Sequence, residues 1–148
     1  MTIKRHVATI DLLCSLAFPE EHGSSDVGIG GPGFHLAELE SSYGLAEGDG
    51  SQREETAEQF EAYVDHISQR LSDRWGKPYR TGLDGVLIRS SDPDESIPEP
   101  WSLFSRRVGN MHLWQSDGTG RWIAVGVSRP SETQEIQLVV LVTEMDPP

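Results

Sequence analysis

The sequence predicts an α+β fold, in which an antiparallel β-meander carries one long amphipathic helix packed on one face. Between Ser51 and Pro78, apolar residues recur every three or four positions, which is the period of one helix face. The last third of the chain holds short apolar segments separated by turn sequences, which is typical of a meander. A length of 148 residues fits one domain, 1–148, with a less regular part at 1–50 and the helix and sheet at 51–148.

The long helix is predicted at about residues 52–75, because both of its ends carry recognisable signals. Ser51 and Glu54 match the S-x-x-E capping box, which satisfies free backbone N–H groups at a helix start. Gly76 suits a left-handed residue after the last turn, and Pro78 prevents continuation. The expected buried stripe consists of Ala57, Phe60, Val64, Ile67, Leu71 and Trp75. Such a stripe needs a partner surface, and strand-like sequence follows it.

The first 50 residues give weaker signals. Apolar spacing in residues 3–18 favours a helix over a strand, and additional helical segments are therefore expected near the N-terminus. Residues 19–33 are rich in Gly, Ser and Pro and are predicted as a loop. Residues 34–43 are predicted as a short helix, and residues 44–50 as an acidic linker.

After the long helix the apolar period becomes that of extended chain. Strands are predicted at Tyr79–Thr81 and Val86–Arg89, separated by an Asp84-Gly85 turn. Residues 90–100 contain three prolines and four acids and are predicted as a loop. Residues 101–108 fit either a helix or a strand.

The final three strands form the meander. They are predicted at Met111–Gln115, Trp122–Ser128 and Ile136–Thr143, with turns at Asp117–Gly120 and Arg129–Glu135. The run Leu138–Val142 is apolar on both faces, as expected of a central or doubly covered strand.

Composition limits the possible partners. The formal net charge is −12, from 24 acids and 12 bases, which disfavours nucleic acid and anionic membrane because both reward Lys and Arg. It favours a basic protein partner, or simply solubility. The one cysteine, Cys14, excludes an internal disulfide and indicates a reducing, cytoplasmic setting; its leucine neighbours predict a buried, inert thiol. No apolar run approaches the length of a membrane span.

Each candidate motif for catalysis or metal binding lacks a residue or a neighbouring element that the chemistry requires. Gly28–Gly33 matches G-x-G-x-x-G, but no apolar strand precedes it, so it is interpreted as a flexible loop. The five histidines lack zinc spacing and are expected at the surface. Asp92–Glu95 lacks the later Gly and Glu of a calcium loop and is predicted as solvated chain. We expect no enzymatic activity, no cofactor and no metal. His112 beside Trp114 is the place we expect a ligand pocket if the chain has one.

One charge pattern has functional content. Nine acids and one base, Arg53, lie between Glu38 and Asp65. The candidate partner-binding residues are Glu54, Glu58, Glu61 and Asp65, which step by three or four and share one helix face, with Trp101 as an apolar contact if exposed. Like charges at this spacing cost roughly 0.2–0.5 kcal/mol per pair. The row is therefore either a solvated face or a docking surface for a basic partner.

The order of elements adds a resemblance. A helix, the segment Arg74–Pro78 and a Trp-containing meander resemble small actinobacterial proteins of the immunity type in polymorphic toxin systems. The residues that carry it are Leu71, Trp75, Gly76, Pro78, Trp114, Gly120-Arg121-Trp122 and Leu138–Val142. The resemblance implies no catalytic chemistry and an acidic surface that blocks a basic toxin, commonly a nuclease.

The sequence therefore favours a cytoplasmic, acidic binding protein, and the resemblance implies an immunity-type inhibitor. Two alternatives stay open: a phage or mobile-element accessory protein that mimics nucleic acid against a host defence enzyme, and a secretion-chaperone-like dimer. An enzyme or small-molecule binder is less favoured. Whether the chain is a monomer or a dimer is left open.

Overall fold

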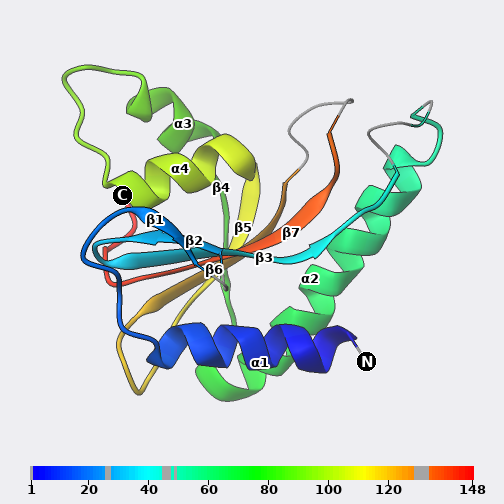
Figure 1. Cartoon of the computed structure of the whole chain (residues 1–148), viewed down its shortest axis with the longest axis horizontal. Coiled ribbons are helices and arrows are strands. Elements are labelled where there is room, and N and C mark those ends of the chain that lie inside the picture. The colour runs from blue at the N-terminus through cyan, green and yellow to red at the C-terminus, as the bar shows by residue number, and fades with distance from the viewer. Residues whose placement is uncertain (1, 26–27, 45–47, 49, 129–133) are drawn as a thin grey trace.

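A computed structural model describes residues 2–25, 28–44, 48, 50–128 and 134–148 (Figure 1). A seven-stranded antiparallel sheet has the strand order β1-β2-β3-β7-β6-β5-β4. The strands are β1 Gly23–Ser25, β2 Gly28–Gly31, β3 Phe34–Ser41, β4 Tyr79–Gly82, β5 Asn110–Gln115, β6 Trp122–Ser128 and β7 Gln137–Thr143. The helices are α1 Thr2–Ser15, α2 Arg53–Trp75, α3 Asp84–Ser90 and α4 Glu99–Arg107. The mixture of helices and an antiparallel sheet confirms the predicted α+β class.

Helices cover both faces of this sheet, not one. Figure 1 shows α1 and α2 on one side and α3 and α4 on the other. On the first face, α1 and α2 contribute core residues such as Ile10, Phe60 and Ile67. On the second face, α4 contributes Trp101 and Phe104 to a separate core cluster. The sheet is therefore the middle layer of three, which explains why its central strands are apolar on both faces.

The long helix agrees closely with its prediction. The side chains of Ala57, Phe60, Val64, Ile67 and Leu71 are buried, whereas Trp75 is partly buried against the same cluster. Gly76 adopts a φ of 83° and its N–H donates to the carbonyl of Ser72. The capping box is wrong in detail, because the N-cap is Gln52 and that residue makes no side-chain capping bond.

The N-terminal region departs from prediction after α1. The expected loop at 19–33 contains strands β1 and β2, and the expected helix at 34–43 is strand β3. Pro32-Gly33 forms the tight turn between β2 and β3, with Gly33 at φ 83°, which is the geometry of a Pro-Gly β-turn. Strand β3 pairs with β2 on one side and β7 on the other, so tertiary pairing overrides its helix-forming residues.

Beyond α2, part of the prediction fails on local turn signals. Tyr79–Gly82 is a strand as expected, but the predicted Asp84-Gly85 turn and Val86–Arg89 strand belong to helix α3. The buried side chain of Leu83 precedes this helix and packs in the cluster beneath α4. The ambiguous segment 101–108 is mostly helix α4.

The meander is confirmed. Strand β6 has the predicted bounds, and β5 and β7 differ from prediction by one residue at their starts. Ser116–Arg121 closes the β5–β6 hairpin, with Gly120 at φ 70°. Strand β7 lies between β3 and β6, as its two-sided apolar run indicated. The predicted turn at 129–135 lies largely outside the described residues.

Candidate functional site

The predicted acidic residues lie along one flank of α2. Glu54, Glu58, Glu61 and Asp65 are all exposed. Their spacing places them beside the buried stripe over about 16 Å of helix, at a rise of about 1.5 Å per residue. Among the described residues, Glu54, Glu58 and Asp65 form no hydrogen bond or ion pair. We call these four residues the acidic row.

Four carboxylates elsewhere have a basic partner, which Glu54, Glu58 and Asp65 lack among the described residues. Carboxylates with a basic partner are Glu40 with Arg5 and His6, Glu99 with His22, Asp11 with Arg74, and Glu95 with Arg89. The Arg74–Asp11 contact also ties α2 to α1, and its hydrogen bond raises the pKa of the guanidinium. The negative charges of Glu54, Glu58 and Asp65 therefore face solvent.

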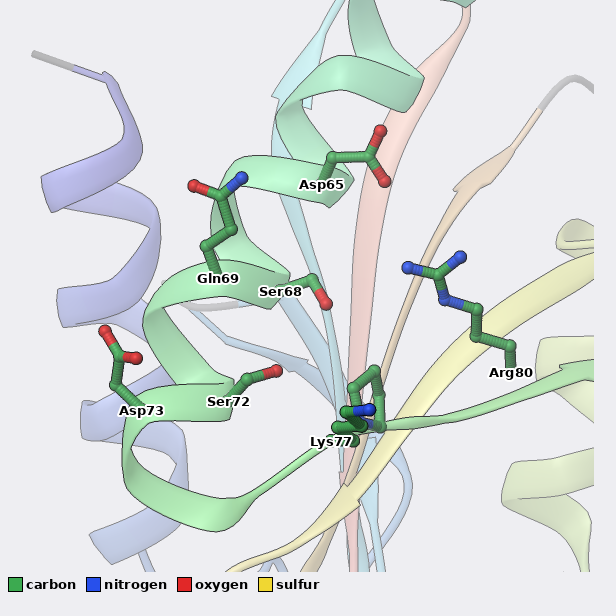
Figure 2. Close-up of a pocket in the computed structure, with 8 residues that line it drawn as sticks. Asp65, Ser68, Gln69, Ser72, Asp73, Lys77 and Arg80 are labelled. Carbon is green, nitrogen blue, oxygen red and sulfur yellow. The ribbon is translucent and has the colours of Figure 1, made fainter.

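A groove begins where the acidic row ends. It has a volume of about 970 Å³ and lies between the C-terminal half of α2 and strand β4 (Figure 2). Its lining residues are Asp65, Ser68, Gln69, Ser72, Asp73, Lys77, Pro78 and Arg80. The groove has this position because strand β4, at the edge of the sheet, lies beyond the strands over which α2 packs.

The groove brings opposite charges together without pairing them. Figure 2 shows the side chains of Asp65, Ser68 and Ser72 pointing from α2 toward the sheet, with the Arg80 guanidinium reaching back toward the helix. The side chains of Gln69 and Asp73 point away from this space in the same view. We call Asp65, Ser68, Ser72, Lys77 and Arg80 the groove residues.

His112 lies close to the groove, although the groove lining does not include it. In the β4–β5 pairing, His112 stands directly opposite Arg80, so the two share a face of the sheet. Burial lowers the pKa of His112, and the positive charge of Arg80 lowers it further, against the opposing influence of Asp65. The buried His112 Nδ1 and Trp114 Nε1 have no hydrogen-bond partner among the described residues. The groove therefore lies near the place where a pocket was predicted, but neither His112 nor Trp114 lines it.

Trp101 was predicted to contact a partner if it is exposed, and the structure shows that it is not. Its side chain is 0% exposed in the cluster beneath α4, and its Nε1 donates to the carbonyl of Met145 at 3.0 Å. An indole that is fully buried and hydrogen-bonded stabilises the fold and offers no surface to a partner.

The prediction that all five histidines lie at the surface is wrong for two of them. His6 and His35 are 1% and 3% exposed. Burial lowers the pKa of both, and for His6 the hydrogen bond to Glu40 at 3.1 Å opposes that effect. Cys14 is buried as predicted, and burial raises the pKa of its thiol to about 11.

The Gly28–Gly33 motif does not form a phosphate site. Gly28–Gly31 is a strand that turns directly into β3, so the helix that a phosphate cradle needs does not follow it. The flexible-loop interpretation is also wrong at Gly28–Gly31 for the same reason. A Cβ at Gly31 would come within 2.8 Å of the Phe34 ring, which accounts for a glycine there.

Sequence reasoning missed the basic half of the groove. Lys77 and Arg80 flank Pro78 in a short exposed segment, and the spacing of Ser68 and Ser72 after Asp65 places them on the same flank of α2. Which strand lies opposite that flank depends on the sheet order, and no local pattern in the chain encodes it.

Within the described ranges, no three side chains of His, Cys, Asp or Glu gather where they could hold a metal ion. No described helix is both long and apolar enough to cross a bilayer. Exposed large apolar side chains such as Leu12, Ile29, Tyr79 and Ile88 come from different helices and strands. No protein-family model matches the chain, and comparisons with curated proteins and with solved structures give no match.

Proposed function

We propose that this chain is a non-catalytic binding protein that docks a basic protein partner on the acidic row of α2, as an immunity-type inhibitor would. The observation that carries the proposal is the exposed, unpaired state of Glu54, Glu58 and Asp65 on one flank. Mutual repulsion along a helix costs about 0.2–0.5 kcal/mol per pair, and an oppositely charged partner would remove that cost.

Inhibition would be steric and electrostatic. Complementary charge speeds the encounter and selects the partner, while the covered surface blocks whatever the partner's basic region normally binds. The rigid support of α2, which packs on the sheet and on α1, holds the carboxylates in place before binding. The setting we propose is the cytoplasm, where the buried thiol of Cys14 would stay reduced.

The exposed apolar residues give less support to a chaperone-like dimer. They are spread over elements that cover different parts of the molecule, whereas such a dimer would use one large apolar patch. A nucleic-acid mimic would use the same acidic row, and the identity of the captured partner separates it from an immunity protein.

The test is capture of partners from host extract at low salt, with full-length chain as bait. Three baits are compared: the wild type, the double variant Glu54→Lys/Glu58→Lys, and the control Glu20→Lys/Glu21→Lys. Both variants change the net charge equally, because each replaces two glutamates by two lysines. Glu20 and Glu21 are a matched control because they are also exposed but lie in the segment after α1.

We expect the wild type and the control to retain one basic protein and to inhibit its activity, and the α2 variant to lose both properties. Equal retention by all three baits, or retention of no basic protein, would overturn the proposal.

A further inference from the structure

We propose a second binding site, which shares Asp65 with the acidic row: the groove between α2 and β4 binds a small zwitterion, a molecule with one anionic and one cationic group. Asp65 would hold the cationic end, and Lys77 and Arg80 the anionic end, with the hydroxyls of Ser68 and Ser72 between them.

The unpaired cations are the first reason. Six of the eleven described cations have an internal hydrogen-bonding partner: Arg5, Arg74 and Arg89 pair with carboxylates, and Arg53, Arg107 and Arg121 donate to polar oxygens. Lys77 and Arg80 have none among the described residues, as is also true of Lys4, Arg70 and Arg106, but only Lys77 and Arg80 line this groove. Two unpaired cations on the same groove make a site for an anionic group.

The unused hydrogen-bonding groups are the second reason. The side chain of Ser68 is 7% exposed and its hydroxyl forms no hydrogen bond among the described residues, and the same holds for the hydroxyl of the half-buried Ser72. Neither serine oxygen is among the buried atoms that lack a partner, so water reaches both, and a polar ligand atom would replace that water. Behind Arg80, the unpartnered Nδ1 of His112 adds a further polar atom to this side of the sheet.

Charge balance selects a zwitterion over other ligands. A polyanion would be repelled by a molecule of net charge −12 and by Asp65 at the groove itself. A simple cation would meet Lys77 and Arg80. A molecule that is neutral overall but carries both charges pairs with both halves of the groove, and a volume of about 970 Å³ accommodates ligands of metabolite size.

The probes are ω-amino carboxylates of increasing length, namely glycine, 4-aminobutyrate and 6-aminohexanoate, with butyrate and butylamine as single-charge controls. Each is titrated into ¹⁵N-labelled full-length chain, and backbone amide shifts are followed by NMR. We expect saturable shifts confined to residues 65–82 and one preferred length, because the gap between Asp65 and Arg80 is fixed by the fold. The preferred zwitterion should bind at least about tenfold more tightly than butyrate, which corresponds to one charge-assisted contact.

Three variants locate the binding. Arg80→Gln should weaken the preferred zwitterion about tenfold or more, and Asp65→Asn should reduce it to the level of butyrate. Arg106→Gln is the matched control, because Arg106 is exposed on α4 and forms no hydrogen bond among the described residues; its binding should equal that of wild type.

The proposal is overturned if no probe gives saturable shifts, if butyrate binds as well as the zwitterions, or if Arg80→Gln leaves the affinity unchanged. This result is separable from the partner-capture result, since Glu54→Lys/Glu58→Lys leaves the groove intact and Arg80→Gln leaves the acidic row intact.

Discussion

Arg121 fastens the N-terminal helix to the sheet, and replacing it by Ala should lower stability well beyond the usual effect of a surface change. The Arg121 Nη1 donates to the carbonyls of Leu13 and Leu16 at 2.8 and 2.6 Å. The guanidinium carbon also lies 4.0 Å from the centroid of the Phe18 ring. The Leu13 carbonyl belongs to the last turn of α1 and the Leu16 carbonyl to the residue directly after it, where backbone oxygens lack helical partners and a cation is favourable.

The magnitude follows from these contacts. Each hydrogen bond contributes about 1 kcal/mol at a partly buried site, and the cation–π contact about 0.5–1 kcal/mol. We therefore expect Arg121→Ala to lower the free energy of unfolding by about 2–3 kcal/mol. For a chain of this size, that corresponds to a fall in Tm of about 4–12 °C. The free energy of unfolding of Arg121→Lys should lie between those of the wild type and Arg121→Ala, because an ammonium group keeps the charge but cannot stack on the Phe18 ring as the planar guanidinium does.

This loss is measured in two ways: by urea unfolding monitored with circular dichroism, and by thermal unfolding. The control is Arg106→Ala, which removes an exposed guanidinium on α4 that forms no hydrogen bond among the described residues; its effect should stay within about 0.5 kcal/mol. If Arg121→Ala and Arg106→Ala unfold at the same midpoint, the contacts of Arg121 do not hold α1 in place.

Three further predictions concern buried groups. Because burial raises the pKa of Cys14 to about 11, iodoacetamide at about pH 8 should modify the native thiol at least about tenfold more slowly than the urea-unfolded thiol, and equal rates would contradict its burial. Burial lowers the pKa of His35 in the folded chain, so below about pH 6.5 the unfolded chain binds more protons than the folded chain does. The contribution of His35 to the free energy of unfolding should therefore be constant above that pH and should fall as the pH falls below it. The urea midpoint should decrease between about pH 7.5 and 5.5, less steeply in His35→Gln, and identical slopes would refute the assignment. Gly126→Ala should destabilise by about 1–3 kcal/mol because its Cβ would come 2.3 Å from Val108 Cγ1, whereas Gly118→Ala, with open space around it, should not.

The parts of the fold that were predictable have local signals that agree with the tertiary structure. The apolar stripe of α2 has the helical period along its whole length, and Gly76 and Pro78 mark its end. In the meander, the turn at Asp117–Gly120 and the two-sided apolar run of β7 both agree with their final environment.

The parts that failed depend on pairing across the chain. Strand β3 contains Leu-Ala-Glu-Leu-Glu, whose helical preference is overridden by ladders with β2 and β7. The side chain of Leu83, the residue directly before α3, is 0% exposed because it packs in the cluster around Trp101, and the predicted turn at Asp84-Gly85 is instead the start of that helix. Single-sequence patterns do not contain these contacts.

The candidate site divides in the same way. The acidic row was predictable because it lies on one helix and its spacing alone sets its geometry. The groove was not, since Arg80 comes to face Asp65 only through the position of β4 at the sheet edge. Trp101 was misassigned because a tryptophan near a proline-rich loop has no local mark that separates a surface anchor from a core residue.

The most direct test of the central claim is the association rate of the captured basic partner with this chain, measured by stopped flow over a series of NaCl concentrations. If the acidic row steers the encounter, the wild-type rate should fall steeply with salt, and Glu54→Lys/Glu58→Lys should be about tenfold slower at low salt with a flatter dependence. The Glu20→Lys/Glu21→Lys control should retain most of the wild-type rate and its slope. Identical rates and slopes for the two double variants would contradict the claim, because net charge alone would then account for binding.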